Sequence, residues 1–336
     1  MEIDSWLTIP NLKEKFDLTE EWKDLIVGMK KGSIRSLARV ITRVENREKG
    51  WLAAMKTIYP LCGKARVIGI TGPPGSGKST LTDKMAAHLI DRGYSVAIIA
   101  IDPSSSFSGG ALLGDRLRMS KTNNLNGLFV RSMATRGATG GLSGATSKTI
   151  QILDAFGKDY ILIETVGVGQ DEIEVTKVAD LVLLLAIPGQ GDLIQDLKAG
   201  VMEIADIFIV NKADRDGADS VAMNIKTMLS MNSSQKKWVP PVLMTVATKG
   251  DGIAELIQTA LDFYSNKDII EKRRKFRIRK EIVDILKSEL VISAEKFIDI
   301  NNSFDHVVEQ ILSGKENPYS YAWNVIVGLF ESIKTN

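Results

Sequence analysis

The amino-acid sequence predicts an α/β protein with a mostly parallel central sheet flanked by helices, and with helical extensions at both ends. Three observations support this fold class. Short apolar, β-branched runs recur along the middle of the chain, most are separated by stretches of three-to-four-residue apolar periodicity, and glycines and polar residues cluster after the runs. Strands buried on both faces that alternate with helices are typical of parallel sheets. The predicted strands are 66–71, 95–101, 128–133, 160–165, 180–187, 206–211 and 242–247.

The first 60 residues are predicted to form an N-terminal helical extension. Apolar residues recur there at helical spacing, and we find no candidate catalytic residue among them. We therefore expect residues 1–60 to cap the next domain, which we place at 61–265. The apolar positions are Trp22, Ile26, Met29, Ile34, Leu37, Ala38 and Ile41.

The last part of the chain, 266–336, is predicted to be a C-terminal helical extension outside the sheet. It opens with the densely charged stretch NKDIIEKRRKFRIRK, and apolar positions follow at helical spacing. We interpret the basic run as the solvated face of a helix, with contact to acidic partners or phosphates as the alternative.

Composition excludes several classes of protein. The 336 residues are 44% hydrophobic and 25% charged, which is ordinary for a globular protein, and a net charge of +2 gives no support for binding nucleic acid or an anionic membrane. The longest apolar runs have strand length, so no membrane span is expected. The N-terminus lacks the pattern of a signal peptide, and a single cysteine favours a reducing compartment, so we expect a cytoplasmic protein.

The segment after the first predicted strand is built to hold phosphate. GPPGSGKS matches the P-loop pattern G-x-x-x-x-G-K-[ST], with a strand before it and a helix after it. Glycines allow consecutive backbone N–H groups to point at phosphate oxygens, and the helix adds its positive N-terminal end. Lys78 is expected to reach the β- and γ-phosphates, and the Ser79 hydroxyl to bind Mg²⁺. The predicted cradle comprises Gly72, Pro73, Pro74, Gly75, Ser76, Gly77, Lys78, Ser79 and Thr80.

Two later strand ends carry candidate base-binding residues. NKAD follows the strand at 206–211, and its carboxylate Asp214 can accept from guanine N1–H and the exocyclic amine, a donor pair that adenine lacks. Lys212 is expected over the base, and Asn211 is expected to tie this loop to the phosphate cradle. One strand later come Val246, Ala247 and Thr248, and the Ala247 N–H is a candidate donor to guanine O6.

Three carboxylates are candidates for metal and water chemistry around the γ-phosphate. Asp102 ends the second predicted strand, Asp115 follows a glycine-rich loop, and Glu164 ends the strand at 160–165. Mg²⁺ takes hard oxygen ligands and needs only one or two carboxylates. We expect Ser79 and these acids to form the metal site, and Lys78 and the acids to act in catalysis. Taken singly, each acid could instead be a helix cap or an ion-pair partner.

Glycine and loop residues complete the expected γ-phosphate region. The Gly167 N–H is a candidate γ-phosphate sensor, but the group that positions the attacking water is not identified, since Gln170 lies three residues beyond Gly167. Arg136, on a glycine-rich loop, is a candidate for neutralising transition-state charge, and a structural role is the alternative. We expect slow hydrolysis that a partner accelerates.

Taken in order, these motifs resemble those of one family. GITGPPGSGKST, AIDPSS, GDRLRM, TRGATGGLS, ETVGVGQDE, VNKAD and PGQGDLIQDLKAGVMEIADI are similar to segments of the MeaB/ArgK/MMAA-type P-loop GTPases over about residues 30–265. The resemblance implies a GTP- and Mg²⁺-dependent chaperone for an adenosylcobalamin-dependent acyl-CoA mutase of the methylmalonyl-CoA mutase type. It would gate cofactor loading and protect or reactivate the mutase.

The resemblance also carries implications for assembly. It implies homodimerisation through the C-terminal extension, a partner-facing switch at Asp192, Gln195 and Lys198, and a family pattern with glutamate at position 164. Two alternatives remain. One is an ATP-dependent kinase associated with arginine/ornithine transport, against which NKAD argues. The other is a nickel metallochaperone, against which two histidines and one cysteine argue.

Overall fold

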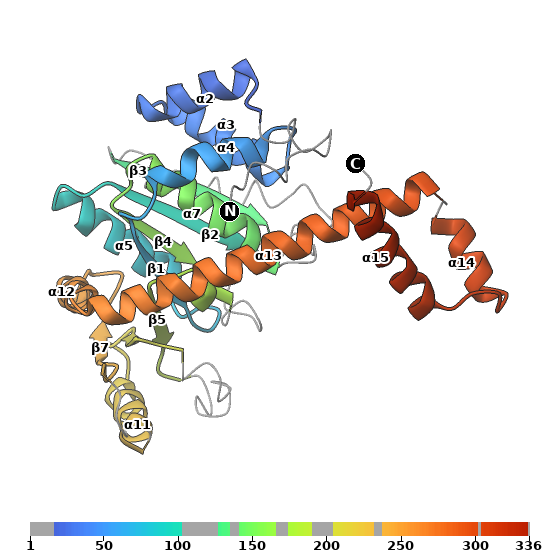
Figure 1. Ribbon diagram of the computed structural model, residues 1–336. Helices are drawn as coiled ribbons and strands as arrows, with labels where there is room; N and C mark the ends of the chain where they lie inside the picture. The colour runs from blue at the N-terminus through green and yellow to red at the C-terminus, as the bar shows by residue number, and fades with distance from the viewer. Residues whose placement is uncertain are drawn as a thin grey trace.

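A seven-stranded parallel sheet forms the centre of the molecule (Figure 1). The computed structural model describes residues 17–102, 127–134, 141–165, 174–189, 204–231, 237–301 and 304–334. The strand order is β3-β2-β4-β1-β5-β6-β7, and all seven predicted strands are confirmed. Their bounds are β1 Arg66–Thr71, β2 Val96–Asp102, β3 Leu128–Ala134, β4 Tyr160–Glu164, β5 Leu181–Ala186, β6 Ile207–Asn211 and β7 Val242–Thr245.

Strand β1 lies at the point where the chain changes direction across the sheet. β1 pairs with β4 on one side and β5 on the other, whereas the chain passes from β1 to β2, which lies beyond β4. Parallel sheets bind ligands at the carboxyl ends of strands near such a switch point. The register sets Ile70 of β1 beside Glu164 of β4, so the end of β4 lies next to the predicted phosphate cradle.

Helices cover both faces of the sheet, as the sequence predicts. One face packs against α2 (Glu20–Lys30), α3 (Ile34–Glu45), α4 (Trp51–Ile58) and α7 (Gly141–Ala155). The other face packs against α5 (Lys78–Asp91) and α12 (Ile253–Tyr264), and α11 (Ala218–Met231) packs beside β5 and β6. The short 3₁₀ helices are η2 (Tyr59–Leu61) and η3 (Val175–Lys177).

The N-terminal helices pack through the apolar stripes that the sequence shows. Trp22 is 1% exposed, and its indole N–H donates to the Lys49 carbonyl at 2.8 Å, which fixes α2 to the turn before α4. Ile34 departs from the expected stripe and is 50% exposed, because it is the first residue of α3.

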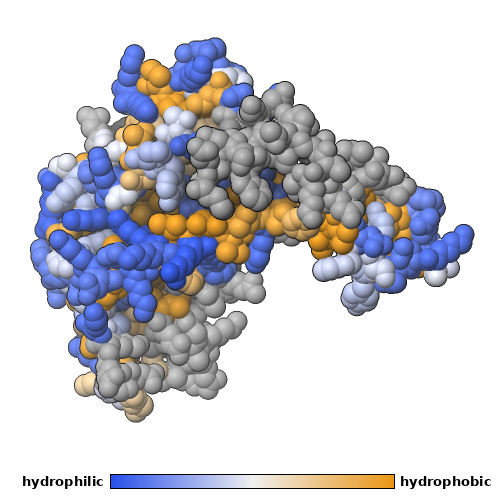
Figure 2. Space-filling view, viewed as in Figure 1, coloured by the Kyte–Doolittle hydropathy of each residue, from blue (hydrophilic) through white to orange (hydrophobic). Residues whose placement is uncertain are grey.

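The C-terminal extension is an arm of three helices. α13 (Lys267–Asn301) crosses the sheet and continues beyond the body, where α14 (Phe304–Leu312) and α15 (Pro318–Lys334) follow, with α15 returning along α13 (Figure 1). Apolar side chains are exposed along the arm, visible as orange surface in Figure 2. No helix in the described residues is long and apolar enough to cross a bilayer.

Three arginines in the first part of α13 bind buried aspartates of the body. The interpretation of 266–280 as a wholly solvated face is therefore wrong. Arg273 donates two hydrogen bonds of 2.6 Å to Asp206, and Arg277 donates to Asp180. Arg274 also lies 3.5 Å from Asp180 and donates to the Ala65 carbonyl at 3.1 Å. Asp180 and Asp206 precede β5 and β6 and are almost fully buried. Buried carboxylates need cationic partners, and these arginines supply them.

Candidate functional site

The segment 72–77 is the loop that joins β1 to α5. At two of its positions the backbone lies so close to neighbouring atoms that only glycine fits. Gly72 has φ +140°, and a Cβ there would lie 2.6 Å from the Leu185 carbonyl oxygen. Gly77 has φ +90°, and a Cβ there would lie 2.4 Å from Asn211 Nδ2. The loop is therefore packed against β5 and β6, which sets its position at the carboxyl edge of the sheet.

Lys78, the first residue of α5, reaches back over this loop. Its ammonium donates to the carbonyls of Gly72 at 2.8 Å and Pro73 at 2.9 Å, and the residue is 6% exposed. The ammonium thus lies within the loop. A buried cation there attracts anionic oxygen atoms, which are stronger acceptors than carbonyls.

Ser76 carries an unsatisfied polar group inside the loop. Its side chain is fully buried, and its hydroxyl has no hydrogen-bond partner among the described residues. Buried hydroxyls nearly always have a partner in native proteins. The orphaned hydroxyl therefore indicates that the loop is complete only with a polar ligand.

Glu164 lies against the first turn of α5. The Ser79 hydroxyl donates to its carboxylate, and the next residue, Thr165, donates to the Thr71 hydroxyl at 3.0 Å. The end of β4 is therefore joined both to α5 and to the end of β1. Ser79 and Glu164 place two hard oxygen donors side by side.

Asn211 at the end of β6 connects three loops. Its amide group donates to the Ser76 carbonyl at 2.8 Å, and its carbonyl oxygen accepts from Thr245 Oγ1 and from the Ala247 N–H, both at 3.1 Å. The side chain is buried. The Ala247 N–H, a candidate donor to guanine O6, is thus directed at Asn211 in this structure, and it would have to be shared with a base.

Lys212 and Asp214 lie at the rim of the site. Lys212 adopts φ +58° and donates to the Gly75 carbonyl at 2.7 Å, so its side chain extends over the loop. Asp214 is exposed, and Lys249 Nζ lies 3.5 Å from its carboxylate. Val246 is bridged to Asp251, and Thr248 is exposed on the following turn.

The sequence of the chain is similar to those of known proteins. Residues 37–297 match the family described as methylmalonyl Co-A mutase-associated GTPase MeaB. The chain belongs to the MeaB family. It is 46% identical over 305 residues to a Pyrococcus horikoshii protein named as a GTPase, covering 89% of this chain and 95% of that one.

Two further relatives of this MeaB-family protein show lower identity. It is 33% identical to the GTPase ArgK of Escherichia coli, covering 86% of this chain and 89% of that one. It is also 33% identical to the mitochondrial methylmalonic aciduria type A homolog of Mus musculus, over 71% of this chain and 62% of that one. The crystal structure of a protein named LAO/AO transport system kinase superposes with a TM-score of 0.63 at 26% identity, covering 95% and 99% of the two chains. This MeaB-family protein is a GTPase with the P-loop NTPase fold.

Several predicted site residues of this MeaB-family GTPase lie wholly or in part outside the described residues. Asp102 ends β2, and its side chain is not among the described ones. Outside the described residues lie Asp115, Arg136, Gly167, Gln170, Asp192, Gln195 and Lys198. The described residues contain no group of three or more His, Cys, Asp or Glu side chains that could hold a metal.

Sequence reasoning missed two members of this MeaB-family site. Thr245 ends β7 and donates to Asn211, and Lys249 pairs with Asp214. The signal for Lys249 was its place two residues after Ala247 on the same turn. Thr245 carried no separate signal, because a threonine at the end of a strand is common in sheets.

Proposed function

We propose that this GTPase controls the loading of adenosylcobalamin into an acyl-CoA mutase of the methylmalonyl-CoA mutase type, and protects or reactivates that mutase. The observation that carries the proposal is the family match over 37–297, whose description names the mutase, combined with a phosphate loop assembled by Asn211 and Lys78. The name of the mouse relative refers to methylmalonic aciduria, which supports a partner enzyme that acts on methylmalonyl-CoA.

In the proposed nucleotide complex, the loop 72–80 surrounds the phosphates. Lys78 exchanges its two carbonyl acceptors for β- and γ-phosphate oxygens, and the orphaned Ser76 hydroxyl gains a polar partner. The N-terminal end of α5 adds favourable electrostatics for the phosphates. Together these groups stabilise the negative charge that shifts onto the leaving phosphate.

The donor set around Ser79 fits a magnesium ion. A serine hydroxyl and a carboxylate are both hard oxygen ligands, and the Ser79–Glu164 contact holds them together. Ser79, Glu164, Asp102 and Asp115 are the proposed ligands or water-shell partners. When bound, Mg²⁺ would neutralise charge between the β- and γ-phosphates. If Glu164 is not itself a ligand of Mg²⁺, its carboxylate would orient a water molecule bound to the ion.

Guanine selectivity is proposed to rest on Asp214. Its carboxylate can accept two hydrogen bonds from guanine, and the exposed Lys249 must then release it or move with it. Lys212 would lie along the base while holding the Gly75 carbonyl.

The arm is proposed to form a homodimer. Exposed apolar side chains on all three helices of the arm leave a surface that a second copy can bury. The residues include Ile282, Leu286, Leu290, Phe304, Trp323, Ile326 and Phe330. Light scattering should report a dimer, and Leu286→Glu should shift it to monomer with little loss of GTP binding.

The test of the function is nucleotide-dependent binding to a purified methylmalonyl-CoA mutase. We expect a complex with the GTP-analogue-bound protein, and faster GTP hydrolysis when the mutase is present. No complex with any nucleotide, and no change in hydrolysis, would contradict the proposal.

A kinase associated with arginine/ornithine transport is the second candidate, because the structural relative is named as a transport-system kinase. It predicts tighter ATP than GTP binding and transfer of the γ-phosphate to a protein. Tighter binding of GTP than of ATP would exclude it, if radiolabel from γ-labelled ATP also appears only as inorganic phosphate when an arginine/ornithine-binding transport protein is present.

A further inference from the structure

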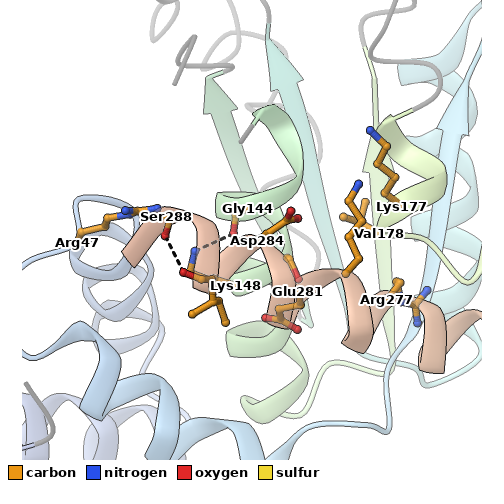
Figure 3. Close-up of a pocket in the computed structure, with 12 residues that line it drawn as sticks. Arg47, Gly144, Lys148, Lys177, Val178, Arg277, Glu281, Asp284 and Ser288 are labelled. Carbon is orange, nitrogen blue, oxygen red and sulfur yellow. Dashed lines mark hydrogen bonds between the residues drawn. The ribbon is translucent and has the colours of Figure 1, made fainter. Parts of the chain in front are cut away.

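A cavity of about 70 Å³ lies between α7, η3 and α13, and its charges are balanced within the protein (Figure 3). Figure 3 shows Lys148 and Arg277 apart along α13, with Glu281 and Asp284 between them. Both of these carboxylates attract Lys148, and Arg277 pairs with Asp180. The cavity is therefore part of the attachment of α13 to the body.

A buried contact between two threonines lies at the nucleotide site itself. Thr71 is the last residue of β1 and Thr165 is the first residue after β4, and they are 0% and 1% exposed. The Thr165 hydroxyl donates to the Thr71 hydroxyl at 3.0 Å, and the Thr165 N–H donates to the Ile70 carbonyl at 3.1 Å. Two polar side chains thus meet at the end of strands whose other buried side chains are mainly apolar.

Packing alone does not explain why both positions carry a hydroxyl. Valine has the shape of threonine without the hydroxyl, and replacing both partners of a buried hydrogen bond by apolar groups of the same shape costs almost no stability. A hydrogen bond, however, fixes the distance and direction between two groups, which apolar contact does not. The pair therefore points to a role in placing the two chain segments relative to each other.

Each threonine is the chain neighbour of a residue of the site. Thr71 precedes Gly72, where the phosphate loop begins, and Thr165 follows Glu164, whose carboxylate contacts the first turn of α5. On its other side Gly72 lies against β5, where a Cβ would come within 2.6 Å of the Leu185 carbonyl oxygen. The start of the phosphate loop is therefore held to β5 by close packing and to the end of β4 by the threonine contact.

The threonine contact uses no atom of the proposed metal site. Ser79 and Glu164 share a hydrogen bond, and a magnesium ion would draw on the oxygen atoms of both. The bond between Thr71 and Thr165 would remain, since neither hydroxyl is a proposed ligand. It can therefore hold the backbone of Glu164 in place beside the phosphate loop whether or not the ion is bound.

We propose that Thr71 and Thr165 are positioning residues for GTP hydrolysis, which set the place of Glu164 relative to the phosphate loop. The inference rests on the proposed role of Glu164 in the magnesium site. A group that binds the ion or orients its water must be held to within about 0.5 Å of the productive geometry. Loss of the threonine contact lets the end of β4 shift while the phosphate- and base-binding groups stay in place. The rate of hydrolysis therefore falls, whereas the affinity for GTP does not.

The test is steady-state GTP hydrolysis by the full chain, measured over titrations of GTP and of Mg²⁺. Thr165→Val should lower kcat about tenfold and raise the Mg²⁺ concentration that gives half-maximal hydrolysis. The KM for GTP should stay within about twofold of the wild type, because the groups that bind the nucleotide are unchanged. Thr165→Ser keeps the hydroxyl and should recover most of the lost rate. The matched control is Thr149→Val, which alters a buried threonine of α7 and should leave both constants unchanged.

A double variant with valine at both positions separates placement from stability. Thr71→Val combined with Thr165→Val removes both hydroxyls, so neither is left buried without a partner, and the urea midpoint should stay close to that of the wild type. Its kcat should still be about tenfold lower. A wild-type kcat in the double variant would overturn the proposal, as would equal losses in Thr165→Val and Thr165→Ser.

Glu164→Ala, measured alongside, separates failure of this inference from failure of the proposed metal site. If Glu164→Ala slows hydrolysis and Thr165→Val does not, the threonines are not positioning residues, and the proposed role of Glu164 stands. If Glu164→Ala has no effect, Glu164 is not part of the metal site, and the inference falls with it. In the Glu164→Ala background Thr165→Val should add almost no further loss, because it acts through Glu164. A further loss of about tenfold there would show that Thr165 acts by another route, which also overturns the proposal.

Discussion

The Ser79 hydroxyl donates a hydrogen bond to the Glu164 carboxylate, which joins the first turn of α5 to the end of β4. The two residues are far apart in the chain and meet because β4 pairs with β1, with Glu164 beside Ile70. In this MeaB-family GTPase, the first turn of α5 and the end of β4 are therefore in direct contact. A change in the position of Ser79 is therefore expected to alter the position of Glu164, and the reverse.

Replacing Glu164 with alanine should reduce Mg²⁺-dependent GTP hydrolysis. We expect roughly a tenfold to hundredfold loss, the usual effect of removing a carboxylate that orients a metal's ligands or waters. Hydrolysis measured across a Mg²⁺ titration checks this, while competition between GTP and ATP for binding should show unchanged guanine selectivity. Unchanged hydrolysis at all Mg²⁺ concentrations would remove Glu164 from the metal site.

Replacing Asn211 with alanine should weaken both the fold and nucleotide binding. The Ala247 N–H and the Ser76 carbonyl would each lose a buried partner, at a cost of about 1–3 kcal/mol of unfolding free energy per group. Urea denaturation and GDP affinity are the measurements. Asn224→Ala, at an exposed position of α11, is the matched control and should change neither. If the urea midpoint of Asn211→Ala equals that of the wild type, the Asn211 side chain is not needed to keep the three loops in place.

Replacing Asp214 with asparagine should change base selectivity. An amide cannot accept both guanine hydrogens, but it can donate to the extra carbonyl of xanthine, so affinity should move from GTP toward xanthosine triphosphate. Lys249→Gln removes the 3.5 Å ion pair while keeping the carboxylate, and it should retain the preference for GTP. Identical nucleotide preferences in Asp214→Asn and the wild type would exclude Asp214 as the base-binding residue.

The sheet could be predicted from the sequence because its strands are buried on both faces and therefore appear as continuous apolar runs. The phosphate loop was equally clear, since Gly72 and Gly77 occupy backbone positions that only glycine tolerates. Local patterns of this kind need no knowledge of distant residues.

The docking of α13 could not be predicted in the same way. Arg273 and Arg277 look like any exposed charges of a basic helix, and their partners Asp206 and Asp180 lie 67 and 97 positions earlier in the chain. Only the sheet, by burying those aspartates at its amino edge, turns the arginines into ion-pair partners. The role of Thr245 toward Asn211 depends on tertiary contact in the same sense.

Replacing Asp180 with alanine should strongly destabilise the protein. Its carboxylate is fully buried, accepts from the Val67 N–H at 3.1 Å, and pairs with Arg277 and Arg274. Removing it leaves buried cationic and amide donors without an acceptor, a loss of about 3–5 kcal/mol. Urea denaturation measures the change. Asp268→Ala breaks an exposed pair with Lys237 and should cost less than about 1 kcal/mol. Equal costs for the two variants would show that the arginine docking adds no stability.

The thiol of Cys62 should remain protonated and unreactive at neutral pH. Burial, followed by the charges of Asp154 and Glu281, raises its pKa to about 12. Cys62 is the only cysteine in the chain, so any alkylation by iodoacetamide reports on it. We expect slow alkylation of the folded protein at pH 8 and fast alkylation in urea, because only the thiolate reacts. Equal rates in both states would mean that the thiol ionises normally.

The same shift makes stability depend on alkaline pH. The folded state holds the Cys62 proton up to about pH 12, whereas the unfolded state releases it near the ordinary value of 9.0. Above pH 9 the unfolded state therefore binds fewer protons, and the unfolding free energy falls as pH rises toward 12. Below pH 9 this contribution is fully present and constant. Urea denaturation of the wild type and of Cys62→Ser between pH 7 and pH 11 isolates the effect, because other alkaline groups titrate alike in both. If the difference in unfolding free energy between the two proteins is the same at every pH in this range, the raised pKa of Cys62 is contradicted.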